Sequence, residues 1–188
     1  NETTQDITVN ILDENDNAPV ITSSSTFLAD ENQTSIGTVV ATDVDFDGSV
    51  TLEYRISGTE ILIGLTSGEL TFVTAPDYET KDTYTATVTV TDGLNETTQD
   101  ITVNILDEND NAPVITSLAS FDMSETRAEP KLVGTVTATD ADFDGSVTLE
   151  YRISGTELTI GLTSGTLELV NAPDYETKNT YTATVTVT

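Results

Sequence analysis

The sequence DENDNAPVITS occurs at Asp13–Ser23 and again at Asp107–Ser117, and it places acidic and amide side chains next to one another. Two carboxylates 4 Å apart repel by roughly 4 kcal/mol at an effective dielectric constant near 20. Carboxylates, amide oxygens and backbone carbonyls are also the ligands that Ca²⁺ prefers. Because Asp and Asn favour turns and Pro removes a backbone donor, we expect each copy to be a linker. A divalent cation would reverse the repulsion within such a linker.

Further acidic residues lie beside predicted strands, and most of them recur in a second copy. They are Glu31 and Glu125, Asp43 and Asp45 with Asp140 and Asp142, Asp77 and Glu79 with Asp174 and Glu176, and Asp92. The chain has no cysteine and no histidine, which excludes disulfides, thiolate zinc sites and the commonest general base. Hard cations that prefer oxygen ligands, such as Ca²⁺, Mg²⁺ and Mn²⁺, remain.

The charge balance limits the classes of partner. The chain has 33 acidic and 6 basic residues, for a formal net charge of −27. Nucleic acids and anionic membrane surfaces bind basic clusters, so we predict neither as a partner. No apolar run has the length of a membrane span, and we expect no membrane insertion in this fragment. Since no nucleophile–base pattern accompanies the acids, we also predict that the chain is not an enzyme.

The chain contains an internal repeat. Asn1–Ser23 returns unchanged at Asn95–Ser117, and Asp45–Glu60 returns with the same motif at Asp142–Glu157. We therefore predict three parts. Residues 1–17 are the last strand and linker of a preceding repeat, residues 18–111 are a complete repeat with its linker, and residues 112–188 are a second repeat that lacks its last strand.

Alternating apolar and polar residues predict β-strands along the whole chain. TYTATVTVT places Tyr84 and the two valines that follow on one face and threonines on the other. Similar runs lie at or near Ile36–Ala41, Val50–Ile56, Ile61–Ile63, Glu69–Val73 and Gln99–Leu106. With no helical period of useful length, the sequence predicts an all-β fold of tandem seven-stranded Greek-key β-sandwiches with Ig-like architecture.

The order of the acidic motifs resembles the cadherin repeat. The motifs are, in order, Glu31, Asp43-Val-Asp45, Asp77-Tyr-Glu79, Asp92-Gly93 and the DENDNAP linker at Asp107–Pro113. Tyr78 stands where the family has arginine, and Pro76 stands where it has leucine. The absence of tryptophan excludes the tryptophan-exchange adhesion of vertebrate members in this fragment. Near-identical repeats, absent cysteines and threonine-rich strands resemble bacterial or archaeal surface proteins more than animal ones.

The resemblance implies that Ca²⁺ binds where one repeat meets the next. At the central junction it implies side-chain ligands from Glu31, Asp77, Glu79, Asn109, Asp110, Asp140 and Asp142, and backbone carbonyl ligands from Glu108 and Asn111. At the N-terminal junction it implies Asn15, Asp16, Asn17, Asp43, Asp45 and Asp92. At the far end, Glu125, Asp174 and Glu176 would form half of a third site.

The resemblance implies an extracellular, calcium-rigidified rod at the cell surface. The rod would serve as a spacer or adhesion segment of an adhesin or fibre, with further copies of the repeat as partners in cis. One alternative is a strand-donating subunit of a filament, in which Gln5–Leu12 of one chain completes the second repeat of another, head to tail. Another is a polysaccharide-binding accessory domain of a large secreted enzyme.

Overall fold

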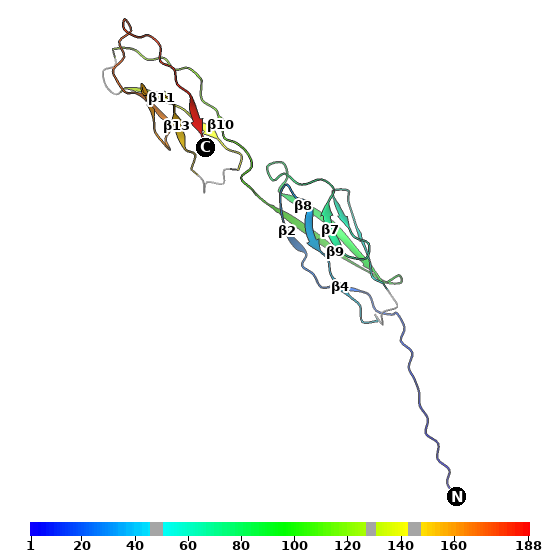
Figure 1. The fold of residues 1–188 in the computed structure, drawn as a ribbon. Helices are drawn as coiled ribbons and strands as arrows, with labels where there is room; N and C mark the ends of the chain where they lie inside the picture. Colours follow the sequence, from blue (N-terminus) through cyan, green and yellow to red (C-terminus); the bar gives the residue numbers. More distant parts are fainter. Residues whose placement is uncertain (46–50, 127–130, 143–147) are drawn as a thin grey trace. The chain divides into compact units, whose positions relative to one another are not determined.

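The structure is a computed structural model that describes residues 1–45, 51–126, 131–142 and 148–188. The chain divides into two compact units, Asn1–Glu108 (unit 1) and Asn109–Thr188 (unit 2). Every element in the described part of the chain is a strand (Figure 1), and no helix there could cross a bilayer. The repeat limits at residues 17 and 111 stay predictions.

Unit 1 is built from two sheets and one short strand pair. Its strands are β1 (Val20–Ile21), β2 (Thr26–Asp30), β3 (Ser35–Thr38), β4 (Ala41–Thr42), β5 (Glu53–Ile56), β6 (Ile61–Ile63), β7 (Glu69–Phe72), β8 (Thr83–Thr91) and β9 (Glu96–Leu106). One sheet has the order β2-β9-β8-β5 and the other β3-β7-β6, while β1 pairs with β4. β2 runs parallel to β9, and β8 and β9 pair antiparallel along their length.

The alternating runs bury one face of each strand between the two sheets. Val88 and Val103 are 0% exposed in one sheet, and Leu70 is 0% exposed in the other. Full burial of such a side chain stabilises the fold by about 1.5–3 kcal/mol relative to leaving it exposed. Because the core draws on both sheets, the two layers form a β-sandwich, as the sequence predicts.

Strand boundaries differ from the prediction at three places. The run predicted near Ile36–Ala41 is divided, since β3 pairs with β7 whereas β4 pairs with β1. The division follows Val39, whose N–H donates to the carbonyl of Gly68 at 2.9 Å. β9 begins at Glu96, earlier than predicted. β5 begins only at Glu53 within the run predicted at 50–56, and residue 50 of that run lies outside the described residues.

Unit 2 repeats this arrangement with fewer strands. Its described strands are β10 (Val114–Ile115), β11 (Leu132–Thr135), β12 (Ala138–Thr139), β13 (Tyr151–Ile153), β14 (Leu158–Ile160), β15 (Thr166–Leu169) and β16 (Val185–Val187). They form a β11-β15-β14 sheet and the pairs β13-β16 and β10-β12. Residues 120–124 and 180–184, which match β2 and the first half of β8, form no strand. Neither do residues 1–12 of unit 1, drawn as the blue N-terminal trace in Figure 1.

Candidate metal centre

Glu31 is turned into unit 1 by the chain that follows β2. Its N–H donates to the carbonyl of Leu106 at 3.3 Å, which continues the β2–β9 pairing by one residue. Asn32 then adopts a left-handed backbone with φ of 61°, a conformation that Asn tolerates better than most residues. The N–H of Asn32 donates to the carbonyl of Pro76 at 2.9 Å. The Glu31 side chain is left 1% exposed.

The carboxylate of Glu31 holds three segments together. Its Oε2 accepts the N–H of Tyr78 at 2.9 Å, and its Oε1 accepts the N–H of Glu108 at 2.7 Å. Hydrogen bonds to a charged group of this kind contribute about 1.5–3 kcal/mol each. Glu31 therefore fixes the loop after β7 and the end of β9 against the end of β2.

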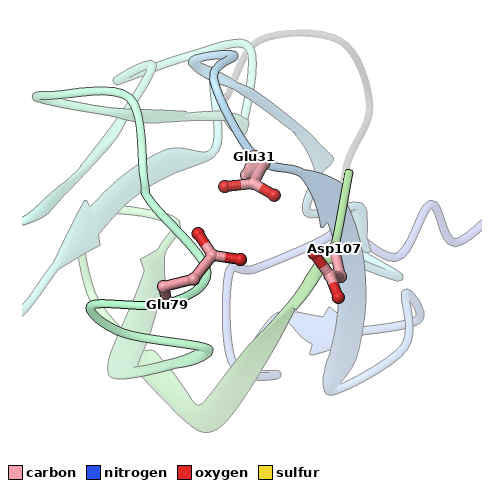
Figure 2. A group of neighbouring side chains, drawn as sticks. All are labelled: Glu31, Glu79 and Asp107. Atoms are coloured by element: carbon pink, nitrogen blue, oxygen red, sulfur yellow. The ribbon is translucent and has the colours of Figure 1, made fainter. Parts of the chain in front are cut away.

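Two further carboxylates lie beside Glu31 at this end of the sandwich. Figure 2 shows Glu79, from the loop after β7, and Asp107, which directly follows β9, facing the same space as Glu31. One oxygen from each of the three lies within 4.8 Å of the others. Oxygen-only donors at this spacing are the set that a hard divalent cation takes.

Four basic side chains form ion pairs with acids outside the Glu31 cluster. Arg55 pairs with Glu53 and Glu96, and Lys81 pairs with Glu60. In unit 2, Arg152 pairs with Glu150 and Lys178 with Glu157. None of these acidic partners is a predicted metal ligand.

The other end of β9 carries a second group of acids, in which Asn17 is central. The N–H of Asn17 donates to Asp45 Oδ2 at 2.6 Å, and its Nδ2 donates to Asp45 Oδ1 at 2.7 Å. Nδ2 also donates to Asp16 Oδ1 at 2.8 Å. The N–H of Asp45 in turn donates to Asp43 Oδ1 at 2.9 Å. These bonds bring the predicted Asp16, Asn17, Asp43 and Asp45 together.

Two buried oxygens in this group have no hydrogen-bond partner among the described residues, namely Asn15 Oδ1 and Asp43 Oδ2. A buried acceptor left unpaired costs about 1–3 kcal/mol. Both residues belong to the predicted ligand set, and both atoms are of the kind that Ca²⁺ binds. The residues present at this end therefore fit a hard cation.

Asp92, also predicted as a ligand, is nearly buried beside this group at 7% exposure. Its Oδ1 accepts the N–H of Asn95 at 2.6 Å and that of Leu94 at 2.7 Å. The N–H of Asn95 is the main cause that lowers the pKa of Asp92; desolvation opposes it, and the N–H of Leu94 and the amides of Asn95 and Asn15 add to the lowering. The ionised form of Asp92 is thus the form that the fold holds.

We expect the Asp92→Asn variant to lose less stability than the parent chain when the pH falls into the acid range. Because the pKa of Asp92 is lower in the folded chain than its ordinary value of 3.8, its contribution to stability is complete above that value. The contribution is lost as pH falls through the lower folded pKa. Urea unfolding at pH 6 and at pH 3 measures the change. The same loss of stability between the two pH values in variant and parent would contradict this role for Asp92.

Unit 2 begins with a copy of the Asn17 arrangement. The N–H of Asn111 donates to Asp142 Oδ2 and its Nδ2 to Asp142 Oδ1, both at 2.7 Å. Nδ2 also donates to Asp110 Oδ1 at 2.8 Å, and the N–H of Asp142 donates to Asp140 Oδ1 at 3.2 Å. A further acidic group occurs in unit 2, where Glu125, Asp174 and Glu176 bring oxygens within 4.8 Å of one another.

Known proteins share both the sequence and the fold. The chain is 33% identical over 201 residues to Protocadherin Fat 4 of Homo sapiens, a match that covers 95% of this chain and 4% of that protein. It is 32% identical over 187 residues to Protocadherin-11 X-linked of Pongo pygmaeus, over 93% of this chain and 14% of that one. The solved cis-dimer structure of protocadherin gammaB7 EC3-6 matches with a TM-score of 0.75 and 28% identity, over 89% of this chain and 47% of that one. The chain consists of cadherin-like repeats.

The cadherin-like repeats also match, over residues 15–105, the family described as Bacterial Ig domain. This match agrees with the predicted Ig-like sandwich, and the protocadherin relatives and structures confirm the resemblance to cadherins. The protein relatives are cadherins rather than enzymes, as the sequence predicts. The chain spans only 4–14% of the curated relatives named above. The bacterial or archaeal origin stays a prediction.

Within the cadherin-like repeats, the site of unit 1 differs from the predicted ligand set at two residues. The exposed carboxylate of Asp77 accepts the N–H and the hydroxyl of Thr80, each at 3.1 Å, and lies outside the Glu31 cluster. Asp107 is in that cluster although it was not predicted as a ligand. Its position directly after a predicted strand was the signal. Asn95, which the sequence analysis does not single out, supports the second group, because its Nδ2 donates to the carbonyl of Asn17 at 3.0 Å.

Proposed function

We propose that these cadherin-like repeats bind Ca²⁺ at their ends and that bound calcium stiffens the chain. The observation that carries the proposal is the cluster of Glu31, Glu79 and Asp107, in which one of the three carboxylates is almost completely buried. The unpaired oxygens of Asn15 and Asp43, near the other end of β9, support a second site. Oxygen-only donors suit calcium better than a transition metal.

The proposed ligands of the central junction follow the prediction with one addition. They are Glu31, Glu79, Asn109, Asp110, Asp140 and Asp142 with the carbonyls of Glu108 and Asn111, together with Asp107. Asp77 stays a predicted ligand, but its carboxylate already accepts two hydrogen bonds from Thr80, which argues against it as a ligand. At the N-terminal junction the proposed ligands are Asn15, Asp16, Asn17, Asp43, Asp45 and Asp92.

Hydrogen bonds within the chain hold in place the carboxylates whose charge calcium would neutralise. Bound Ca²⁺ supplies two positive charges and takes six to eight oxygens. Glu31 is held in place by two backbone N–H groups, and Asp142 is held by the N–H and the side-chain amide of Asn111. The carboxylates of the linker repel one another, and without a cation we expect this charged segment to be flexible. Ligands on both sides of the linker would turn that hinge into a stiff connection.

The proposed role is that of an extracellular spacer or adhesion segment of a larger surface protein or fibre. Extracellular calcium modules bind with dissociation constants of about 10⁻⁴–10⁻³ M, which suits external calcium rather than the cytosol. The partners we propose are further copies of the repeat in cis. The matching structure of protocadherin gammaB7 is a cis-dimer, which supports that class of partner. Polysaccharide binding gains no support from the described residues.

Thermal unfolding in calcium and in chelator tests the proposal. At ten times the dissociation constant each site stabilises the folded chain by about 1.4 kcal/mol, so we expect the Tm in calcium to exceed that in chelator by roughly 5–10 °C. The double variant Asp110→Ala/Asp142→Ala is expected to lose the part of this shift that comes from the central junction. A control with the same change of charge is Glu69→Ala/Glu168→Ala, on the exposed faces of β7 and β15. Equal Tm values in calcium and chelator would refute calcium binding.

A second candidate function is head-to-tail association of chains into a surface filament. The observation that favours it is the exposure of apolar side chains in residues 2–12, which repeat the sequence of β9. Ile7 is 81% exposed and Ile11 is 88% exposed, whereas the matching Ile101 and Ile105 are 2% and 4% exposed. A segment with this alternation is stable as a strand only when one face is buried.

A further inference from the structure

The loop between β7 and β8 carries Glu79, and hydrogen bonds anchor this loop on the side that precedes Glu79. The N–H of Tyr78 donates to Glu31 Oε2 at 2.9 Å, and the carbonyl of Pro76 accepts the N–H of Asn32 at 2.9 Å. The side chain of Glu79 is exposed. A loop that a ligand must order on binding lowers the affinity for that ligand, so an anchor after Glu79 would matter for cation binding.

Lys81 supplies an anchor after Glu79. Its N–H donates to the carbonyl of Asp77 at 2.9 Å, which closes the turn that contains Glu79. Its Nζ lies 2.6 and 2.7 Å from the two carboxylate oxygens of Glu60 and 4.2 Å from the centre of the Tyr84 ring. The ring face attracts the ammonium group in addition to the carboxylate. We call the contacts among Lys81, Glu60 and Tyr84 the Lys81 clamp.

The Lys81 clamp connects the loop to both sheets of unit 1. Glu60 directly precedes β6, and its carbonyl accepts the N–H of Val73 at 2.9 Å. Tyr84 lies in β8 of the other sheet, and its ring packs on the ring of Phe72 with 4.9 Å between the centroids. The end of the loop is therefore fixed to the sandwich itself and not to another loop.

The Lys81 clamp is too exposed to be a major source of global stability. The side chains of Lys81 and Glu60 are 40% and 56% exposed. Ion pairs with this exposure stabilise folded proteins little, because water screens the charges and holding two long side chains in one geometry costs entropy. The main effect of the clamp is therefore expected on the local geometry of the loop.

We propose that Lys81 is a positioning residue for the calcium site at Glu31, Glu79 and Asp107. The inference rests on the proposed calcium binding and adds a residue that is not among the proposed ligands. Lys81 holds the loop in the place where an oxygen of Glu79 lies within 4.8 Å of oxygens of Glu31 and Asp107. Without the clamp the cation must itself order the loop, so its affinity falls.

The charge of Lys81 by itself predicts the opposite effect. Lys81 follows Glu79 by two residues, and a positive charge near the site repels a divalent cation. Removal of that charge alone would therefore raise the calcium affinity. Removal of the positioning contact lowers the affinity, so the direction of the change distinguishes the two effects.

Unit 2 contains the same contacts after its own acidic tract. Lys178 Nζ lies 2.7 and 2.6 Å from the two carboxylate oxygens of Glu157 and 4.9 Å from the centre of the Tyr181 ring. Two of the six basic residues of the chain are thus used in this way. The pair in unit 2 provides a matched control, because its removal makes the same chemical change and leaves unit 1 unaltered.

The test is a calcium titration of the full chain, followed by NMR. The amide resonances of Tyr78 and Glu108 report on the site, since both N–H groups bond to Glu31. The double variant Glu60→Gln/Lys81→Met removes the clamp without a change of net charge. We expect it to bind calcium about 10-fold more weakly at this site, the lower end of the range for residues that support metal ligands. Lys81→Met alone is expected to weaken binding as well, against the effect of its charge.

The control Glu157→Gln/Lys178→Met is expected to keep the affinity of the parent chain at the site in unit 1. An affinity of the Lys81 double variant equal to or above that of the parent, or the same weakening in the control, would overturn the proposal. Hydrogen exchange in chelator at the core amides of Val88 and Val103 is expected to be unchanged. Faster exchange there would assign the loss to global stability and overturn the positioning role. A parent chain that does not respond to calcium would instead refute the proposed calcium binding itself.

Discussion

The variant Glu31→Ala is expected to destabilise unit 1 more than any other single acidic substitution. The change removes the acceptor of two backbone N–H groups, those of Tyr78 and Glu108, at a site that is 1% exposed. Hydrogen bonds to a charged acceptor contribute about 1.5–3 kcal/mol each, so the expected loss is about 3–5 kcal/mol. For a unit of this size the Tm should fall by more than about 10 °C. Scanning calorimetry in chelator measures the loss without any contribution from calcium.

Glu125→Ala is the matched control, because Glu125 is the counterpart of Glu31 in unit 2. Glu125 is exposed, and the bond to its carboxylate comes from the N–H of Tyr175 at 2.8 Å. We expect a fall in Tm of only a few degrees for unit 2. Equal falls for the two variants would contradict the structural role given to Glu31.

The second large effect is a change in stability that has opposite signs with and without calcium. We expect the double variant Glu79→Gln/Asp107→Asn to be more stable than the parent chain in chelator and less stable in calcium. In chelator the three carboxylates, with oxygens within 4.8 Å of one another, repel by about 1 kcal/mol per pair in a water-like dielectric, and the amides remove that repulsion. In calcium the same amides are weaker ligands, and the site loses two charged oxygens. Calorimetry under both conditions measures the two opposite shifts.

Asp77→Asn separates this effect from a general change of charge. Asp77 lies in the same loop as Glu79, yet its carboxylate bonds to Thr80 rather than to the cluster. For this variant we expect the effect on stability to have the same sign in chelator and in calcium. If Asp77→Asn behaved like the double variant, the ligand set would have to include Asp77 in place of the assignment made from the geometry.

The fold could be predicted from the sequence because alternation is a local property. The predicted runs that become β6, β7 and β8 lie within one residue of the expected bounds, and the run that becomes β9 ends where expected, since apolar and polar side chains alternate along each. The division of residues 36–41 between β3 and β4 could not be predicted. It depends on two different partners, β7 and β1, and on the contact of Val39 with Gly68.

The candidate site could be predicted by residue type but only partly by position. Glu31 and Glu79 are far apart in the sequence, and the family's order of motifs was the reason to place them together. Asp107 was missed because its membership depends on where β9 ends relative to β2, which is set by the pairing of Asp30 with Leu106. Asp77 was predicted because the Asp77-Tyr-Glu79 tract resembles the family's motif, and its carboxylate accepts the N–H and the hydroxyl of Thr80.

The pairing of unit 2 shows the reverse case, in which identical sequence gives different structure. The segment Thr83–Thr91 is a strand throughout in unit 1, whereas the same residue pattern in unit 2 is a strand only at Val185–Val187. Strand propensity is equal in the two copies, so the difference comes from the neighbour that β9 provides in unit 1. Local pattern predicts that a segment can pair, and tertiary context decides whether it does.

Crystallisation of the chain in calcium tests the central claim most directly. The account predicts an ion beside Glu31, Glu79 and Asp107, with calcium–oxygen distances of about 2.3–2.6 Å and further oxygens from the acidic linker completing the shell. A crystal grown in millimolar calcium in which these three carboxylates turn into solvent, with no ion between them, would contradict it.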